Sequence, residues 1–474
     1  MSDLVWKTAV ELAALIKRGE VSATEVLRAH LEQIDALNPE LNAIVTYLPD
    51  MALELAREAD EKQARGEELG LLHGLPIAHK DANETKGIRT TMGSPVYRDY
   101  IPESDDLIIA RLKAAGCITV GKTNVPEFGA GSHTFNRVFG ATRNPYDLSR
   151  TCGGSSGGAA VALAAGMIPI ADGSDLGGSL RNPASFCNVV GFRPSPGRVP
   201  QYPASNAWAR LSVDGPMGRT VQDAALMLQA IAGYDPRAPI SLEAPPALFA
   251  ADLERDFQDV KIAYSPDLGE LPVDPQVTET IEKQLPVLSD LGCRLEGAAP
   301  DFRDAYDIFQ TLRAWSFELN FAERFAEFGE EQFKETIRWN VARGVRLTGA
   351  DISRTEVKRT ELFHRVREFL DTYEFLLLPT AQVPPFLLEW EYPTQINGVA
   401  METYIDWMMS CAYITVTELP AISVPCGFTD DGLPVGLQIV GRPRSDFAVL
   451  QLAYAFQEAT RFNQQKPPIG QSQI

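Results

Sequence analysis

The sequence predicts an α/β fold in which a central sheet is covered by helices on both faces. Short apolar runs, typical of buried strands, alternate with longer segments of helical periodicity. The chain has 474 residues, of which 45% are hydrophobic and 22% charged. These values are typical of a soluble globular protein with a large core.

The N-terminal part of the chain predicts helices only. Ser22 and Glu25 match the capping box, in which each residue satisfies a free N–H group of the other. Asp50 is the expected N-cap of a third helix. The three predicted helices span residues 7–18, 22–37 and 51–65.

The rest of the chain alternates between the two kinds of segment, with no internal repeat, which predicts a single domain over residues 1–474. The predicted strands are 75–78, 117–120, 167–171, 260–263, 375–378, 421–425 and 437–440. The predicted helices between them are 106–115, 158–165, 221–232, 277–291 and 447–460. Residues 300–410 add long charged helices and many aromatic side chains.

The charge balance excludes some classes of partner. There are 43 Lys and Arg against 63 Asp and Glu, a net charge of −20. Binding to a nucleic-acid backbone needs a basic face, so we expect no nucleic-acid partner. The longest apolar run, 159–171, contains Gly166 and Pro169 and is too short to span a bilayer. We therefore expect no membrane partner.

The cysteines indicate a reducing compartment. None belongs to a C-x-x-C pair, which favours buried free thiols over a disulfide framework or a zinc site. The first residues lack the pattern of a secretory signal, so we expect a cytoplasmic protein. The six cysteines are Cys117, Cys152, Cys187, Cys293, Cys411 and Cys426.

One nucleotide-binding motif is a chance match. Residues 116–123 fit the string G-x-x-x-x-G-K-T, which requires a loop between a strand and a helix. Here residues 117–120 are themselves typical of a strand, and Gly116 is expected to follow the end of a helix. Pro126 then stands where a helix should begin, so we expect no nucleotide site.

A hydrolase motif also fails in its usual form. Residues 153–157 match G-x-S-x-G, which needs an acidic residue and then a histidine downstream. The one histidine that follows is His364, expected on the surface of a helix. This disfavours a Ser-His-Asp triad. The five histidines of the chain also show no metal-binding spacing, so we expect no metal.

A lysine and two glycine-framed serine clusters remain. Residues 153–158 and 173–181 bring serines next to glycines, where backbone N–H groups can approach a substrate closely. Lys80 follows an apolar run and is expected at a buried strand end. Lowering the pKa of a lysine from about 10.4 to near 7 requires about 4 kcal/mol, which burial can supply. Taken alone, an ion pair of Lys80 with Asp81 and a helix N-cap at the serines explain these residues equally well.

The order of these segments resembles the amidase signature family. The resemblance implies an amidase signature fold with a mixed central sheet covered by helices. It also implies an N-terminal helical segment at 1–66, a signature core at 67–235 and a variable substrate-pocket region at 300–410. The matching segments are 74–81, 121–124, 153–158, 173–181, 420–425 and 432–438.

The family's catalytic group is a Ser–cis-Ser–Lys triad, and it requires no cofactor. The resemblance implies that Lys80 is the general base, Ser155 the bridging serine after a cis peptide bond, and Ser179 the nucleophile. The implied oxyanion-hole segment is Leu176, Gly177, Gly178 and Ser179, and the implied supporting residues are Ser156, Asp175 and Arg181. The candidates for substrate binding are Gly129, Ala130, Gly131, Trp315, Tyr404 and Trp407.

The substrate is less closely defined. Residues 191–200 are closer to members that act on nylon oligomers, aryl amides and carbamates (urethanases) than to the transamidase members that act on charged tRNA. Two residues depart from the family pattern, Leu176 in place of Thr or Ile and Glu418 in place of a glycine. We expect hydrolysis of small hydrophobic amides or carbamates. The alternatives are a non-catalytic amidase-fold binding protein and a transamidase subunit that resembles the glutamyl-tRNA amidotransferases. A homodimer is the default assembly.

Overall fold

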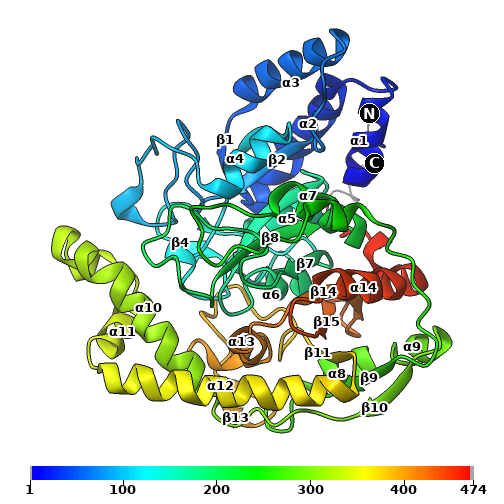
Figure 1. Ribbon diagram of the computed structural model, residues 1–474. Helices are drawn as coiled ribbons and strands as arrows, with labels where there is room; N and C mark the ends of the chain where they lie inside the picture. Colours follow the sequence, from blue (N-terminus) through cyan, green and yellow to red (C-terminus); the bar gives the residue numbers. More distant parts are fainter. Residues whose placement is uncertain (1–2, 470–474) are drawn as a thin grey trace.

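The computed structural model describes residues 3–469 and is built on an eight-stranded mixed sheet (Figure 1). Strands β10, β9 and β11 run parallel, and the remaining neighbours pair antiparallel. In sheet order the strands are β10 (Arg294–Gly297), β9 (Lys261–Tyr264), β11 (Phe375–Pro379), β15 (Pro434–Gly441), β14 (Ala421–Phe428), β7 (Val190–Arg193), β8 (Val213–Gly218) and β6 (Ile170–Asp175).

Helices cover both faces of this sheet, as β15 shows. A side chain at Gly436 would meet Ser185 of α6 (Arg181–Phe186), whereas one at Gly441 would meet Val449 of α14 (Asp446–Thr460). Positions five residues apart on a strand point to opposite faces, so α6 and α14 lie on opposite sides. The predicted fold class is confirmed.

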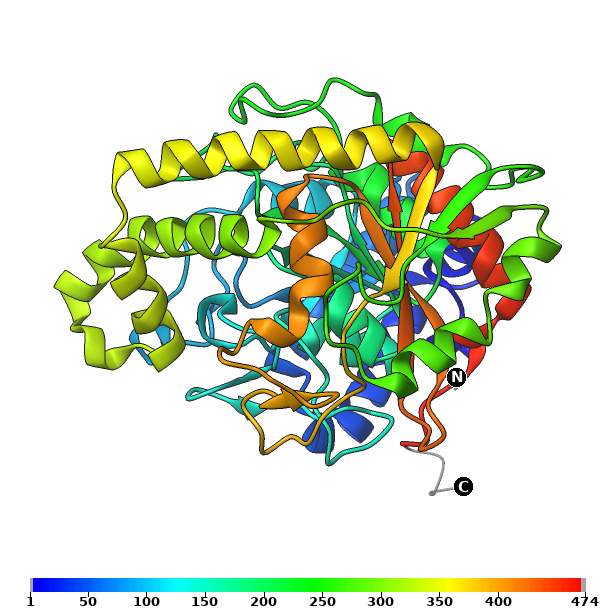
Figure 2. The ribbon, with the colours of Figure 1, turned by 90° about the horizontal axis from the view of Figure 1, so that it is seen from below.

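The remaining helices surround these two layers. Helices α10 to α12 project to one side of the sheet, and α12 crosses the molecule (yellow in Figure 2). They are α1 (Ala9–Lys17), α2 (Ala23–Leu41), α3 (Pro49–Ala64), α4 (Leu107–Ala114), α5 (Gly157–Ala164), α7 (Val221–Ile231), α8 (Pro275–Glu282), α9 (Pro286–Asp290), α10 (Ala305–Phe328), α11 (Glu335–Gly344), α12 (Gly349–Thr372) and α13 (Met409–Val416).

A second sheet of three strands carries the lysine segment. Its order is β1 (Ile44–Tyr47), β3 (Ile118–Thr123) and β2 (Pro76–Lys80), with β2 and β3 parallel. All residues of β2 and β3 are buried. Two short hairpins complete the strands, β4 (Phe135–Asn136) with β5 (Gly140–Ala141) and β12 (Gln395–Ile396) with β13 (Val399–Ala400).

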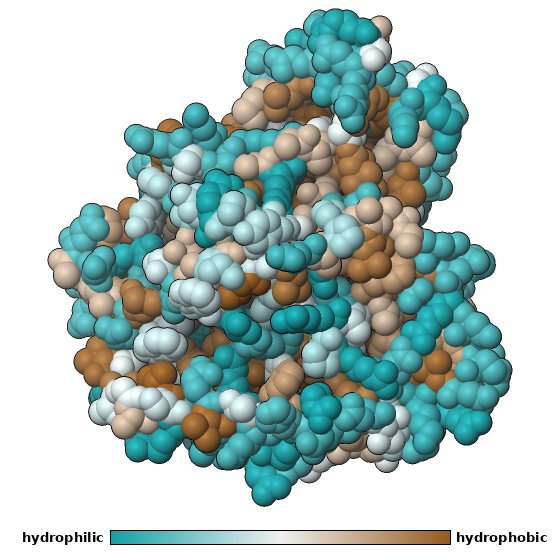
Figure 3. Space-filling model, in the orientation of Figure 1, coloured by the Kyte–Doolittle hydropathy of each residue, from teal (hydrophilic) through white to brown (hydrophobic). Residues whose placement is uncertain are grey.

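The outer surface is strongly polar. Figure 3 shows one face on which hydrophilic side chains predominate, in keeping with the net charge of −20. Within residues 3–469, no helix combines the length and apolar character needed to cross a membrane. The six cysteines are buried free thiols, as predicted.

Some predicted element boundaries are wrong. Ser22 and Glu25 do form a capping box, but Asp50 lies inside the first turn of α3, whose N-cap is Leu48. The helix predicted over 277–291 is broken into α8 and α9, because Pro286 cannot continue the preceding helix. The prediction also missed strands β1, β7, β8 and β10, whose apolar runs are short or contain glycine and charged residues.

Helix α5 lies in the interior, with all eight of its residues buried. Its glycines allow close approach of other backbone segments. A Cβ atom at Gly158 would lie 2.6 Å from the carbonyl oxygen of Ala43 and 2.8 Å from that of Asn124. No side chain fits there without backbone movement.

We predict that Gly158→Ala lowers the free energy of unfolding by about 1–3 kcal/mol, because overpacking a tight interior costs this much. Urea denaturation measures the change. Gly349→Ala is the matched control, since nothing lies within 4 Å of its Cβ position at the start of α12. The control should be neutral or slightly stabilising. Equal losses in both variants would contradict the packing explanation.

Candidate active site

Lys80 ends strand β2 and is completely buried. Its Nζ atom lies 2.9 Å from each of three hydroxyl oxygens, those of Ser155, Ser156 and Ser174. It also donates to the carbonyl oxygen of Ser174 at 3.4 Å. The ion pair with Asp81 that the residues alone allowed is absent from the contacts of residues 3–469, where Asp81 instead accepts from Thr91.

Burial lowers the pKa of Lys80 to about 8, while the negative charges of Asp214, Asp172 and Asp175 oppose the fall. The pKa therefore stays above the near-neutral value considered from the sequence. At pH 7 most of the amine is protonated, and a rise of one or two pH units makes it neutral. A lysine of this kind can act as a base at mildly alkaline pH.

Asp172 on β6 fixes the backbone at Lys80. Its carboxylate is fully buried and accepts hydrogen bonds from the Lys80 amide at 3.1 Å and from Asn83 Nδ2 at 2.7 Å. His79 Nδ1 lies 2.8 Å from the same carboxylate, and its Nε2 contacts Thr119 Oγ1 at 3.0 Å. Sequence reasoning missed this network. Its signal was two ionisable residues, His79 and Asp172, within or beside apolar strands.

The two candidate serines lie close together at the start of two helices. The Gly154–Ser155 peptide bond is cis, and Ser155 is 3% exposed and Ser179 8% exposed. The Ser156 amide donates to the Ser179 carbonyl at 3.2 Å, which ties the loops together. Within residues 3–469, no hydrogen bond joins the hydroxyls of Ser155 and Ser179.

Asp175 organises the loop that carries Ser179. Its carboxylate accepts from the amide of Gly178 at 2.8 Å and from Arg181 at 2.9 and 3.0 Å. Arg193 adds a contact at 3.2 Å. Burial alone would raise the pKa of Asp175, but the charges of Arg181 and Arg193 outweigh it and hold the pKa below its usual value. All three side chains are fully buried, so Asp175 stays ionised.

The Gly178 amide is therefore committed to a carboxylate. Three other backbone amides of this loop, at Leu176, Gly177 and Ser179, have no hydrogen-bond acceptor among residues 3–469. Free amides in a tight turn form a concave donor site for an anionic oxygen. Of the four residues predicted for an oxyanion hole, three thus present a free donor and one supports the loop.

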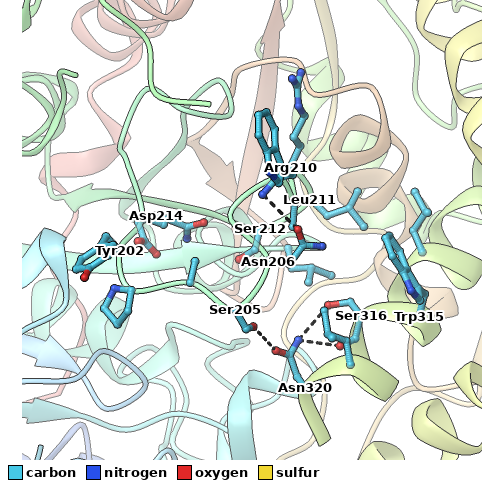
Figure 4. Close-up of a pocket in the computed structure, with 18 of the residues that line it drawn as sticks. Tyr202, Ser205, Asn206, Arg210, Leu211, Ser212, Asp214, Trp315, Ser316 and Asn320 are labelled. Carbon is cyan, nitrogen blue, oxygen red and sulfur yellow. Dashed lines mark hydrogen bonds between the residues drawn. The ribbon is translucent and has the colours of Figure 1, made fainter. Parts of the chain in front are cut away.

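A cavity of about 700 Å³ reaches this loop at Leu176. It lies between the segment 201–212 and helix α10, and Figure 4 shows Trp315, Ser316 and Asn320 of α10 facing that segment. Trp315, one of the predicted binding residues, lies in its wall. Further walls are Leu107, Ile108, Tyr202, Trp208, Leu211, Leu312 and Leu319, with Asp106, Asp214 and Glu418 at polar positions. The size and the aromatic and aliphatic walls suit a small organic molecule.

The other predicted binding residues lie elsewhere. Gly129 lies against Ser155, since a Cβ atom there would be 3.3 Å from the Ser155 hydroxyl. Ala130 is buried beside it, and Gly131 faces the ring of Tyr404. Trp407 is 1% exposed and stacks on Phe186 in the core. Neither Tyr404 nor Trp407 belongs to the cavity wall.

Glu418 explains one departure from the family pattern. Its φ of 60° lies in the left-handed region, which glycine adopts without strain. Its carboxylate accepts from Arg359 at 2.8 Å and from Arg210 at 3.5 Å. These contacts join the segment 201–212 to helix α12 at the cavity wall. The other departure, Leu176, contributes its backbone amide, which its side chain leaves unchanged.

The remaining sequence motifs take the expected places. Lys122 lies in strand β3 and donates to Asn83, Thr85 and Thr90, so the nucleotide motif is a strand and not a loop. His364 is exposed on helix α12. Within residues 3–469, no group of His, Cys, Asp or Glu side chains is placed to hold a metal ion.

Comparisons with known proteins agree with this geometry. The family model for amidases matches residues 25–450. An acylamidase of Rhodococcus erythropolis is 34% identical, with 98% of each chain covered. The amidase-like subunit of the glutamyl-tRNA(Gln) amidotransferase of Moorella thermoacetica is 35% identical, with 99% of each chain covered.

Solved structures give the same result. A bacterial aryl acylamidase of the amidase signature family superimposes with a TM-score of 0.91 at 30% identity, covering 98% of this chain and 99% of that one. A 6-aminohexanoate cyclic dimer hydrolase gives 0.88 at 27% identity with the same coverage. The chain belongs to the amidase signature family. It is an enzyme of that family, a hydrolase of carbon–nitrogen bonds.

We predict that Asp175→Asn lowers the free energy of unfolding by about 3–5 kcal/mol at pH 7, because it leaves Arg181 and Arg193 buried without their counter-charge. The folded pKa of Asp175 lies below its unfolded value, so its contribution is complete above about pH 4 and declines as pH falls through the folded pKa. Urea denaturation at pH 7 and at acid pH measures this. A difference between variant and wild type that did not shrink in acid would contradict the ionised assignment.

Proposed function

We propose that this enzyme hydrolyses small hydrophobic amides through a seryl acyl-enzyme, with Ser179 as nucleophile, Ser155 as bridging serine and Lys80 as base. Aryl amides, 6-aminohexanoate-type amides and carbamates are the candidate substrates. The observation that carries the proposal is the contact of 2.9 Å between the buried Lys80 amine and the Ser155 hydroxyl. This contact links a base of lowered pKa to the loop beside Ser179.

The reaction begins with two proton transfers. Neutral Lys80 accepts the proton of the Ser155 hydroxyl as Ser155 accepts the proton of Ser179. The Ser179 oxygen then attacks the carbonyl carbon of the amide. For this step the two serine hydroxyls must come within hydrogen-bond distance, and such contacts often tighten only when substrate binds.

The developing oxyanion then needs donors. The amides of Leu176, Gly177 and Ser179 are free to supply them, and each donor of this kind contributes about 3–4 kcal/mol. The C–N bond breaks as the proton held by Lys80 passes through Ser155 to the leaving amine. Water, activated by the same path in reverse, attacks the acyl-enzyme and releases the acid. Ser156 and Ser174 hold the amine of Lys80 in place throughout.

The cavity supports the substrate class. Its walls at Trp208, Trp315, Leu312 and Leu211 are apolar, and it touches the reaction centre at Leu176. An aryl or alkyl group on the amide nitrogen fits this space, and the amine has an open path on release. The resemblance to an acylamidase and to an aryl acylamidase supports the same class.

A transamidase is the second candidate, because the glutamyl-tRNA(Gln) amidotransferase chain of Moorella thermoacetica is as similar in sequence as the acylamidase. The net charge of −20 weighs against an RNA partner. A transamidase would show little hydrolysis alone and would retain a partner during purification.

We predict turnover of at least one class in a panel of anilides, aminohexanoate amides and aryl carbamates. Ser179→Ala and Lys80→Ala should each lower kcat by at least about 10³-fold, because each removes a member of one proton-transfer unit. Release of the amine is followed by absorbance. Full activity of Ser179→Ala would exclude the proposed nucleophile, and glutamine-dependent transfer alone would favour the transamidase.

Labelling with a fluorophosphonate separates an active enzyme from a binding protein. The reagent should modify Ser179 in the wild type and fail with Ser179→Ala and Lys80→Ala, which peptide mass spectrometry detects. An unlabelled wild-type protein would support the non-catalytic alternative.

We predict that kcat/KM falls about tenfold per pH unit below a pH of about 8, because only neutral Lys80 accepts a proton. Asp214→Asn removes the negative charge that most favours protonated Lys80, so the acid limb should move to lower pH. Asp223→Asn is the control, because Asp223 is equally buried but lies in α7, and it should leave the limb in place. A limb that moves to higher pH in Asp214→Asn would exclude Lys80 as the titrating base.

A further inference from the structure

Arg313 on helix α10 is a buried arginine without a carboxylate partner. It is 4% exposed, and no acidic group within residues 3–469 forms an ion pair with it. The other deeply buried arginines of the sheet region are paired, Arg181 and Arg193 with Asp175. An unpaired buried cation is costly, and this cost points to a missing anion.

The donors of Arg313 are only partly used. One Nη atom donates to the Tyr404 hydroxyl at 2.8 Å, and that hydroxyl also accepts from Asn340 Nδ2 at 2.7 Å. Having accepted two bonds, the Tyr404 hydroxyl still has its own proton to donate. The Nε atom of Arg313 and the hydroxyl of Thr336 on α11 are buried with no hydrogen-bond partner among the described residues.

Aromatic rings hold the guanidinium in one place. Its central carbon lies 4.5 Å from the ring centre of Phe317 and 5.7 Å from that of Tyr404. Such contacts stabilise the cation and restrict its orientation. A water molecule could satisfy Thr336 and the unpaired Asn340 Oδ1, but it carries no charge to match the guanidinium.

This group of side chains lies beside the reaction centre. Phe309, one helical turn before Arg313 and on the same face of α10, packs against Gly177, where a Cβ atom would lie 2.8 Å from its ring. On the other side, Tyr404 lies 3.7 Å from the Cβ position of Gly131, and Gly129 lies against Ser155. The arginine therefore adjoins the loops that carry both candidate serines.

Helix α10 separates this group from the cavity. Leu312, Trp315 and Ser316 line the cavity, whereas Arg313 does not. The leaving amine needs an exit, which the cavity provides. The acyl part stays bonded to Ser179 until water attacks, so it suits the enclosed side next to Arg313.

We propose that Arg313, together with the Tyr404 hydroxyl, binds a carboxylate at the far end of the substrate's acyl group. This inference rests on the proposed function and narrows its substrate class to amides of dicarboxylic acids that keep one free carboxylate. The guanidinium supplies charge-assisted hydrogen bonds to the carboxylate, and the phenol supplies one more. The cost of the unpaired cation is offset when this anion binds.

Paired substrates test the proposal. N-phenyl amides with an acyl chain of two to four methylene groups and a terminal carboxylate are compared with N-phenyl alkanamides of the same length. The wild type should show at least about 10-fold higher kcat/KM for the carboxylates. Arg313→Met should remove a factor of roughly 10–100 from kcat/KM for the carboxylates, mainly through KM, and should change the neutral amides by less than about threefold.

Two variants separate recognition from structure. Arg313→Lys keeps the charge and should recover part of the preference. Arg324→Met removes another arginine that stacks on rings along α10 and should leave the preference unchanged. Equal losses for charged and neutral amides in Arg313→Met, or no preference in the wild type, would overturn the proposal.

A binding measurement keeps this test independent of turnover. Calorimetry with the Ser179→Ala variant should show the carboxylate-bearing anilide binding more tightly than its neutral counterpart, and adding Arg313→Met should abolish the difference. Equal binding of the two anilides would reject the carboxylate site. Preferential binding with no turnover by the wild type would instead reject the proposed hydrolysis and leave the site in place.

Discussion

The structure depends on placing one lysine amine where water cannot reach it. Lys80 is surrounded by three serine hydroxyls, and burial lowers its pKa to about 8. This environment requires two sheets to meet, because Lys80 ends β2 while Ser174 belongs to β6. The carboxylate of Asp172 joins them through the Lys80 amide. The same carboxylate favours protonated Lys80, so the anchor that positions the amine also limits how far its pKa falls.

A second buried charge network has a different purpose. Asp175 is held ionised by Arg181 and Arg193, and it uses its oxygens to fix the amides of Gly178 and Leu180. The loop between these residues thus has a fixed shape, with neighbouring amides turned away from the carboxylate. Preorganised donors of this kind need no rearrangement during reaction. The balanced charges stabilise the loop, whereas the unbalanced charge of Arg313 calls for a ligand.

Helix α10 connects the signature loops to the variable region. It contacts the Gly177 turn through Phe309, the cavity through Leu312 and Trp315, and the unpaired cation through Arg313. Changes along one helix can therefore alter both halves of the substrate site without altering the buried lysine. This arrangement is consistent with a family in which related chains carry different names, such as acylamidase and amidotransferase.

The sequence by itself determined the fold class, most of the elements and the family. Local periodicity and glycine-framed serines are properties of neighbouring residues, so they can be read from the chain; the capping box at Ser22 and the strand at Lys122 are examples. The signature segments also predicted which lysine and which serines to examine, and the structure brings Lys80 to Ser155.

The tertiary structure decided what depends on distant partners. Asp172 lies 92 residues from Lys80 in the chain, and the role of Trp315 in the cavity wall, unlike that of Trp407 in the core, follows from how helices pack. Whether a buried charge is matched, as at Arg181, or unmatched, as at Arg313, depends on contacts between segments far apart in sequence. Burial and electrostatic pairing arise from the whole fold, and for that reason composition and spacing could not reveal them.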